Sequence, residues 1–399
     1  MAVQVVTDST SCLPAELAAA AGVTVVPIHA DGKGVERTTA GLSAMELTAQ
    51  YARLLERSGD EGVVALHIAK GLSATWSNGT TAAGVVGDAV RVIDTESAGM
   101  VIGYAALAAG ECAQQGGTVD EVEAAARETL ESARLWLYVH RIDALRKGGR
   151  LSTARSLFTS ALAFKPIFEI SGGKLTLAAR SRTQSKAMDR LLALVVEQVK
   201  NATVEISPED DPAAAPTPSM RVAVHYAEDP EVAAELLARI QVAVQELGET
   251  EAEAAEGAST FGSTPRQPKE GKPGRRGGVE VEDSVKPAVR EVVNEVARSA
   301  TTFLERVVAS RAVQKFTAVA EAEHADSEAS DSTAENAGTQ SSAENSGPQP
   351  SAEEEPVQEP RAHVVPKVDL HLVPMGEAVQ THTGEGAVAV STVRLPPRK

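Results

Sequence analysis

The chain has 399 residues, a formal net charge of −17 and a sequence pI near 5.0, and only 3% of its residues are aromatic. An acidic chain with so few rings is a poor partner for nucleic acid, although its length allows two or three domains. Two distant cysteines, Cys12 and Cys112, exclude a cysteine-based zinc site and fit a reducing, cytoplasmic compartment, and the longest apolar stretch, 98–109, is shorter than the ~20 residues of a transmembrane segment.

Short β-branched strands alternate with helices over residues 1–142. Strands are expected at 3–7, 23–28, 63–68, 90–93 and 135–139, and helices at 15–21, 44–55, from about 76, from 98 and at 121–133. Ser43 and Glu46 are spaced as a capping box for the helix at 44–55. Alternation of this kind predicts an N-terminal α/β lobe built on a parallel, doubly wound sheet.

Polar turns follow several of these strands, and each turn carries Ser or Thr. The turns lie at 7–11, 38–43, 71–75 and 94–97. Parallel strands place such turns at the carboxyl edge of the sheet, where ligands bind. In the turn at 71–75 a helix start offers unpaired N–H groups that suit an anion, so Ser73 and Thr75 are candidates for holding an anionic head group. Hydroxyls at this position are also common as plain helix caps. Ser9 and Ser97 are further candidates for supporting hydroxyls.

A second α/β lobe is predicted from residues 143–247 and 366–399. Its expected elements are a basic turn at 145–152, a β-hairpin at 164–179, a helix at 185–200, a loop at 203–218, a strand at 220–226, a helix at 230–247, and strands at 368–373 and 388–393. The hairpin makes the sheet mixed. Between the last two strands, Gly384 and Gly386 follow His382 in a turn that permits close backbone approach.

Residues 248–365 differ in composition from both lobes. Glu, Ala, Ser, Gly, Pro, Gln and Thr dominate, so the segment is expected to be a partly disordered, low-complexity insert. Apolar residues at helical spacing predict one long helix at 284–320. A basic cluster at 266–276 is interpreted as a solvated linker, given its acidic surroundings.

Eight segments, taken in order, resemble the DegV family, the fatty-acid-binding subunits of bacterial fatty acid kinase. The segments are TDSTSCLP at 7–14, TVVP at 24–27, GLSAT at 71–75, VIDTESA at 92–98, LRKGGRLS at 145–152, FKPIFEISGGKL at 164–175, RSRTQSKA at 180–187 and THTGEG at 381–386. The resemblance covers residues 1 to about 200, 220–247 and 366–399. Each segment is weak alone, but the ordered set is specific.

The resemblance implies a two-domain DegV-like fold with a long-chain fatty acid between the lobes. Such a protein presents the carboxylate to a separate, ATP-dependent fatty acid kinase subunit, so the chain is expected to be a carrier in phospholipid metabolism and not an enzyme. The fatty acid is its ligand, and no cofactor or metal is expected. By the same resemblance, Thr39, Ser73 and His382 contact the carboxylate, and Arg150 lies near the opening.

Several positions depart from the family pattern. The stretch before Thr39 is shortened, Ala40 and Leu42 replace a Ser and a Pro, and Glu385 replaces a Pro. The Ser-Ser pair that usually precedes GLS is Ala69-Lys70 in this chain. If the second Ser of that pair is the important one, Lys70 takes its place and carboxylate binding would be altered.

Two other functions stay open on the sequence alone. The segment at 71–75 nearly matches the G-x-S-x-G nucleophile elbow, and Ser73, Asp94 and His382 occur in the order of a serine hydrolase, although Thr75 replaces the final Gly. A scaffold protein without ligand is the other alternative, with the insert as its partner-binding region. The sequence contains no Walker A loop and no kinase signature, so ATP binding by this chain is not expected.

Overall fold

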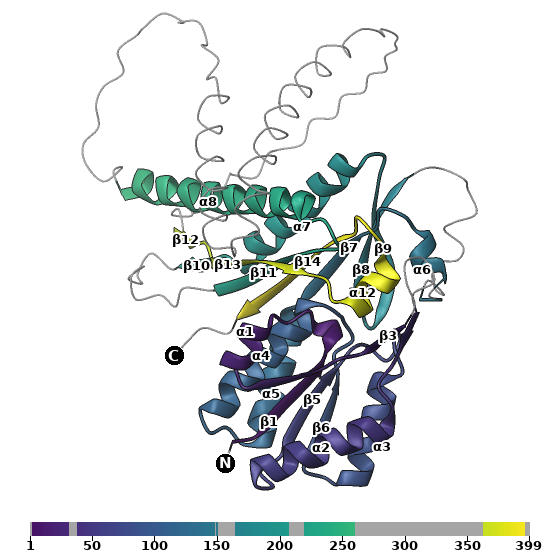
Figure 1. The fold of residues 1–399 in the computed structure, drawn as a ribbon. Coiled ribbons are helices and arrows are strands. Elements are labelled where there is room, and N and C mark those ends of the chain that lie inside the picture. The colour runs from purple at the N-terminus through teal and green to yellow at the C-terminus, as the bar shows by residue number, and fades with distance from the viewer. Residues whose placement is uncertain are drawn as a thin grey trace, which may run out of the picture.

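The structure, a computed structural model, describes residues 2–31, 38–147, 149–150, 164–206, 219–259 and 362–395. The fold contains two main β-sheets with helices packed on them, one in the lower and one in the upper half of Figure 1. The predicted α/β fold is confirmed, with a parallel sheet and a mixed sheet. The helix expected at 284–320 lies outside the described residues.

The first sheet has four strands in the order β2-β1-β5-β6, and all its neighbours pair in parallel. The strands are β1 (Gln4–Asp8), β2 (Val23–Val26), β5 (Val63–His67) and β6 (Val90–Asp94). Every residue of β5 is buried, as expected for a strand covered on both faces. The sheet is therefore the doubly wound sheet that the sequence predicts.

Helices cover both faces of this sheet. The helices of this part of the chain are η1 (Ser9–Ser11), α1 (Ala15–Ala20), α2 (Ala44–Ser58), α3 (Thr75–Val86), α4 (Met100–Gln114) and α5 (Val119–Ser132). Leu47, Tyr51 and Leu54 of α2 pack on one face of the sheet with Val6. Met100 and Tyr104 of α4 belong to the core on the other face. The predicted capping box of α2 is present.

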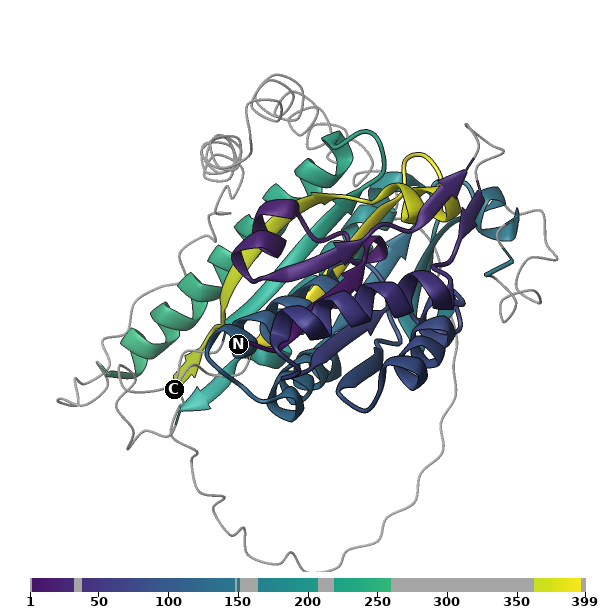
Figure 2. The ribbon, with the colours of Figure 1, turned by 60° about the horizontal axis from the view of Figure 1, so that its bottom comes forward.

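The second sheet has six strands in the order β13-β11-β14-β7-β8-β9, of which only the β11–β13 pair is parallel. The strands are β7 (Arg134–Tyr138), β8 (Lys165–Ser171), β9 (Lys174–Ser181), β11 (Ser219–Tyr226), β13 (Lys367–Pro374) and β14 (Val388–Leu395). Helices α7 (Gln184–Ala202) and α8 (Glu231–Ser259) cover its outer face. Its inner face contacts α4 and α5 (Figure 2).

Four expectations need correction. The strand expected at 135–139 in the N-terminal lobe is β7, which pairs with β14 and β8 of the second sheet, because an apolar strand pattern does not specify its partner. Within the expected loop and insert, β10 (Val204–Ile206) and β12 (Ala362–Val364) form a short antiparallel pair. The helix expected at 230–247 continues to Ser259. The expected turn around His382 is the short helix α12 (Glu377–Thr383).

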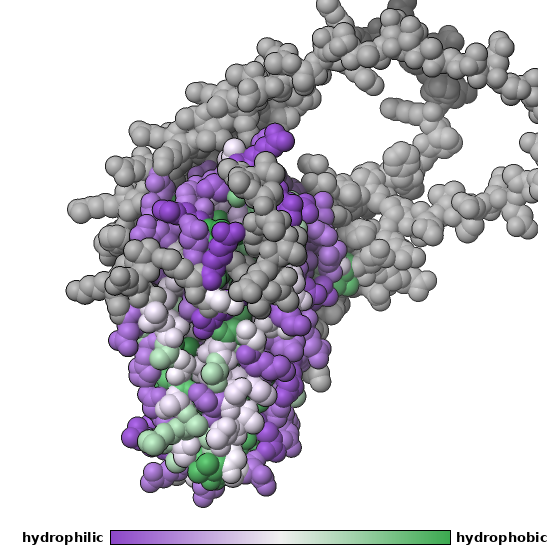
Figure 3. All heavy atoms as spheres, turned by 90° about the vertical axis from the view of Figure 1, so that its right-hand side faces the viewer, coloured by the Kyte–Doolittle hydropathy of each residue, from purple (hydrophilic) through white to green (hydrophobic). Residues whose placement is uncertain are grey.

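Three further small elements complete the described part. Strands β3 (His29–Asp31) and β4 (Thr38–Ala40) form an antiparallel pair, and α6 (Asp143–Lys147) is a single short helix. Within the described residues, no helix is long and apolar enough to cross a membrane. Seen from the right-hand side of Figure 1, the lower part of the surface is less hydrophilic than the upper part (Figure 3). Helix α3 contains no charged residue, and Val85 on it is 70% exposed.

Candidate ligand-binding site

A cavity of about 210 Å³ lies between the parallel sheet and the inner face of the mixed sheet. Most of its wall is aliphatic or sulfur-bearing, and the residues of this kind include Ile28, Ile68, Leu137, Ile170, Leu175 and Met375. These residues belong to both lobes. The cavity is therefore an apolar space that requires both lobes for its formation.

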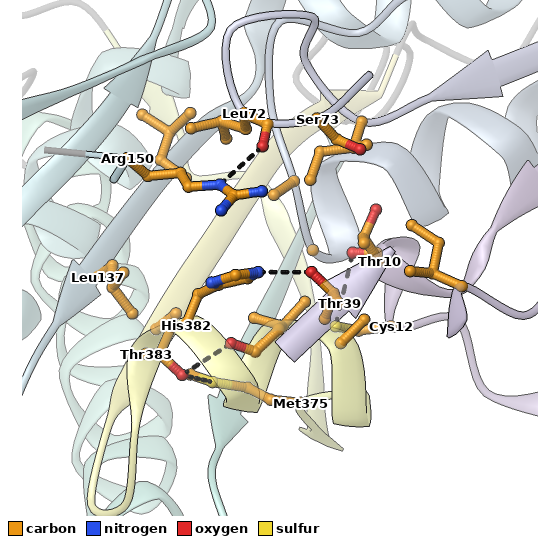
Figure 4. A pocket seen from close by; sticks show the side chains of 18 of the residues that line it. Thr10, Cys12, Thr39, Leu72, Ser73, Leu137, Arg150, Met375, His382 and Thr383 are labelled. Carbon is orange, nitrogen blue, oxygen red and sulfur yellow. Dashed lines mark hydrogen bonds between the residues drawn. The ribbon is translucent and has the colours of Figure 1, made fainter. Parts of the chain in front are cut away.

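Polar side chains gather at one part of the wall (Figure 4). Thr39 comes from β4, Ser73 from the turn between β5 and α3, and His382 from the last turn of α12, while Arg150 follows α6. The Thr39 hydroxyl and His382 Nε2 are 2.8 Å apart and share a hydrogen bond. Arg150 Nε donates to the carbonyl oxygen of Leu72 at 3.1 Å. Four side chains that are distant in sequence thus lie around one cavity.

The turn at 71–75 holds Ser73 through local hydrogen bonds. Its Oγ accepts from the Thr75 backbone N–H at 3.2 Å and lies 2.9 Å from Thr75 Oγ1. The N-cap residue of α3 is Ala74, so the Ser73 hydroxyl is not a plain N-cap; it bonds the N–H of the first helical residue and also lines the cavity. A Cβ atom on Gly41 would lie 3.2 Å from Ser73 Oγ, so a glycine there lets the segment after β4 approach the turn closely.

His382 is neutral at physiological pH. Desolvation is the main cause that lowers its pKa, the positive charge of Arg150 adds to it, and the pKa falls to about 4. A neutral imidazole has one donor and one acceptor nitrogen. The polar part of the cavity therefore combines two hydroxyls, a neutral imidazole and one permanent positive charge. These four groups can hydrogen-bond a carboxylate, so its charge is compensated without several buried ion pairs.

A buried network fixes the ends of β1 and β5 beside this site. Asp8 accepts a hydrogen bond from the backbone N–H of Ile68 at 3.2 Å and is 2.9 Å from His67 Nδ1, while His67 Nε2 is 2.7 Å from the Tyr51 hydroxyl. Burial alone would raise the pKa of Asp8, but hydrogen bonds from His67, Thr10 and Ile68 outweigh it and the pKa is lowered. The network therefore stabilises the carboxylate and positions Thr10, which lines the cavity.

The β8–β9 hairpin closes the cavity from the second lobe. At its tip the Gly173 N–H donates to the Glu96 carbonyl oxygen at 2.9 Å. A Cβ atom on Gly71 would lie only 2.5 Å from the Gly173 carbonyl oxygen, so the turn at 71–75 and the hairpin tip pack backbone against backbone. Glycine at position 71 is thus required by this close approach between the lobes.

The remaining predicted supporting residues lie outside the cavity wall. Ser9 Oγ accepts from the Ile28 N–H at 2.9 Å, Thr75 is buried behind Ser73, and Ser97 lines a second, more polar cavity. Instead, Thr10 and Cys12 of the same TDSTSC segment line the site. The sequence signal for the segment was present, but the turn geometry selects which of its side chains face the ligand space.

Lys70, at one of the departures from the family pattern, is not among the described residues that line the cavity. Lys70 Nζ lies 3.3 Å from Asp94 Oδ2 and 5.4 Å from the Trp76 ring centre, and it lines the second cavity. Asp94 also accepts hydrogen bonds from the N–H groups of Lys70 and Glu96. In this arrangement Asp94 belongs to the second cavity and His382 bonds Thr39, so these residues do not have the hydrogen bonds of a Ser73–His382–Asp94 triad.

The sequence and its architecture are similar to those of known proteins. The profile of the DegV family, described as an uncharacterised protein family, matches residues 31–258. A DegV domain-containing protein of Corynebacterium glutamicum is 49% identical over 195 residues, which is 49% of this chain and 71% of the relative. One of Mycobacterium tuberculosis is 40% identical over 235 residues, covering 54% of this chain and 83% of the relative.

Solved structures share the fold. The crystal structure of a DegV family protein from Corynebacterium glutamicum aligns over 100% of both chains, with a TM-score of 0.60 and 28% identity. A fatty-acid-binding DegV family protein from Thermus thermophilus aligns over 99% of this chain and 100% of its own, with a TM-score of 0.58 and 18% identity. With a family profile that spans more than half of the sequence and close relatives that carry the same domain, the chain belongs to the DegV family.

Proposed function

We propose that this protein binds a long-chain fatty acid in the cavity between its lobes, with the carboxylate held by Thr39, Ser73 and His382. One observation carries the proposal: these three side chains and Arg150 converge on one part of a mostly apolar cavity. Fatty-acid-binding DegV proteins of the same fold from Thermus thermophilus and Bacillus subtilis support it.

The chemistry of the wall suits both ends of such a ligand. Each CH₂ group that leaves water for an apolar wall contributes ~0.8 kcal/mol. The carboxylate needs hydrogen bonds in compensation, since an unpaired buried charge is very costly. Ser73 and Thr39 supply hydroxyls, and Arg150 supplies charge at the same part of the wall. Binding of the ligand would replace the Thr39–His382 hydrogen bond with bonds to the carboxylate.

We further propose that the bound carboxylate is presented to a separate, ATP-dependent kinase subunit, which forms the acyl phosphate. The family resemblance of the sequence supports this step. The polar groups lie beside Arg150, which is only partly buried, so the head group is the end of the ligand nearest to solvent. The two free cysteines fit a cytoplasmic location for this role.

Lipid analysis of the purified full chain tests the first proposal. Mass spectrometry of an organic extract is expected to find long-chain fatty acids at about one per chain, since one cavity holds one acyl chain. Extraction of no lipid from a folded protein would favour the scaffold alternative and overturn the proposal. The kinase step is tested separately, by adding ATP and a bacterial fatty acid kinase subunit to the loaded protein and assaying acyl phosphate.

The serine hydrolase alternative has its own test. A fluorophosphonate probe labels an activated serine nucleophile, whereas a serine that only caps a helix and binds a carboxylate does not react. No labelling at Ser73 is expected, because within the described part of the chain its hydroxyl bonds Thr75 and no histidine or carboxylate. Labelling that is lost in Ser73→Ala would contradict the carrier function.

A further inference from the structure

His225 is a buried imidazole on the cavity wall that the carboxylate site does not use. It lies near the end of β11 and is 1% exposed. Its neighbours Val224 and Tyr226 pack in the outer core of the mixed sheet, so His225 faces inward. In the sheet register His225 is opposite Ala389, and Ala389 is opposite Leu137, and all three residues line the cavity. They form one row of its wall.

Only one of the two ring nitrogens of His225 is satisfied within the protein. Its Nε2 lies 2.8 Å from Ser391 Oγ. Among the residues that the structure describes, Nδ1 has no hydrogen-bond partner. Gly99 packs closely against the other edge of the ring, since a Cβ atom there would lie 3.2 Å from His225 Cε1 and 3.5 Å from Nε2. Burial lowers the pKa of His225 to about 3, so the ring is neutral.

The bond to Ser391 accounts for only one of the two ring nitrogens of His225. Strands β11 and β14 already pair through their backbones from Ser219↔Leu395 to Tyr226↔Val388, so a side-chain bond between them adds nothing to the register. An aliphatic side chain would match the surrounding wall, but it would leave the buried Ser391 hydroxyl without this partner. Nδ1 is therefore the ring nitrogen that is left for a partner among the contents of the cavity.

We propose that the natural ligand is a hydroxy fatty acid, whose chain hydroxyl hydrogen-bonds Nδ1 of His225. The Ser391 hydroxyl can either donate or accept, so Nδ1 is free to be an acceptor or a donor. A hydroxyl group matches both states, whereas a methylene group matches neither and an ammonium group would bring an unpaired charge into the cavity. This inference rests on the proposed function and narrows its ligand class.

The proposal is tested on the full chain after its lipid has been removed, with a series of hydroxy fatty acids that differ only in the position of the hydroxyl. Isothermal titration calorimetry compares stearic acid with hydroxystearic acids that carry the hydroxyl at successive carbons. One narrow range of positions is expected to bind about tenfold more tightly than stearic acid, the gain of one satisfied buried hydrogen bond. His225→Leu is expected to remove this preference and to keep stearic acid binding. The matched control is His371→Leu on the neighbouring strand β13, outside the cavity wall, which keeps the preference.

Two results would overturn the inference. In the first, every hydroxy isomer binds no more tightly than stearic acid, as expected if water occupies the site beside Nδ1. In the second, the preference survives in His225→Leu. If that variant does not fold, the positional series on the unmodified chain still decides. Binding of stearic acid alone leaves the fatty-acid function intact, whereas binding of no acid at all overturns both proposals.

Discussion

At the scale of single residues, Ser73 shows that one hydroxyl can serve the fold and the cavity together. Its oxygen accepts from the N–H of Thr75, the first residue of α3, and it also lines the ligand space. A sequence cannot separate these roles, because both require a hydroxyl before the same helix. The structure makes them compatible, since the second lone pair of an oxygen stays available after the cap is made.

The carboxylate site gives the first prediction. Ser73→Ala and His382→Ala are each expected to weaken fatty acid binding about tenfold or more, because each removes a hydrogen bond to a charged group. Titration calorimetry with palmitic acid measures the change. Ser77→Ala on the exposed side of α3 is the control and keeps the affinity. Unchanged affinity in both cavity variants, with unfolding temperatures near that of the wild-type chain, would show that other residues hold the head group.

His225 gives the second prediction, on stability against pH. Its folded pKa of about 3 lies below its ordinary value of 6.5, so below pH 6.5 the unfolded chain binds a proton that the folded chain does not. The free energy of unfolding therefore decreases as pH falls from about 6.5 towards 3, by up to about 1.4 kcal/mol per pH unit from this residue.

Urea unfolding of the wild-type chain and His225→Leu at pH 7 and pH 5 measures that contribution. The variant is expected to lose less stability between the two pH values. Titrations of other groups are common to both proteins and cancel in the difference. An equal loss of stability in the two proteins would mean that the buried ring is protonated in the folded state.

The motifs of the turns indicate side chains that lie together in the structure. Thr39, Ser73, Arg150 and His382 were chosen from motifs, and they line one cavity. Between two adjacent hydroxyls the sequence could not choose. Ser9 was selected, yet its Oγ bonds the Ile28 N–H and its neighbour Thr10 faces the cavity. That choice depends on the short helix η1, whose geometry no residue pattern specifies.

At the scale of elements, strand and helix types were predictable and strand partners were not. The apolar run at 63–68 indicated a buried strand, and β5 is buried throughout. The run at 135–139 has the same character, yet β7 joins the other sheet. Periodicity reports how many faces of a strand are covered, but the partner depends on contacts far away in sequence. His225 was missed for the same reason, since only pairing with β14 places it on the cavity wall.

The contact between the turn at 71–75 and the hairpin tip gives the third prediction. Gly71→Ala is expected to push the β8–β9 tip away, because its Cβ atom would lie 2.5 Å from a backbone oxygen that cannot rotate aside. Fatty acid affinity and unfolding temperature should both fall, since Ile170 and Leu175 of this hairpin line the cavity. Differential scanning fluorimetry and palmitic acid titration measure the two effects.

Gly84→Ala on α3 is the matched control for this substitution. Nothing lies within 4 Å of a Cβ atom at that position, so the change introduces no contact. Alanine is a better helix former than glycine by up to about 1 kcal/mol, and the control should therefore be neutral or slightly stabilising. If Gly71→Ala behaves like this control, the close approach of turn and hairpin has no role in closing the cavity.

At the scale of the whole molecule, α4 and α5 belong to both lobes. They contact strands of the parallel sheet and β14 of the mixed sheet, so one core joins the two sheets. The cavity opens beside this shared core, where the first residues before α4, Ala98 and Gly99, meet the wall of the mixed sheet. A common layer of helices thus holds the two lobes together. The ligand space lies between the lobes, beside this layer.

The last prediction concerns residues 260–361, which lie between α8 and β12 and are dominated by Glu, Ala, Ser, Gly, Pro, Gln and Thr. The described cavity residues come from elsewhere in the chain, and the two elements that flank this segment, α8 and β12, contact each other (Figure 1). A Gly/Ser linker of about 20 residues has an average span of about 25 Å, enough to join neighbouring elements. Replacing 260–361 by such a linker is therefore expected to leave palmitic acid affinity unchanged within about twofold.

Ser73→Ala in the shortened chain should weaken binding as it does in the full chain. A shortened protein that keeps its unfolding temperature but loses the fatty acid would show that the segment takes part in the site, and the two-lobe account of binding would be wrong.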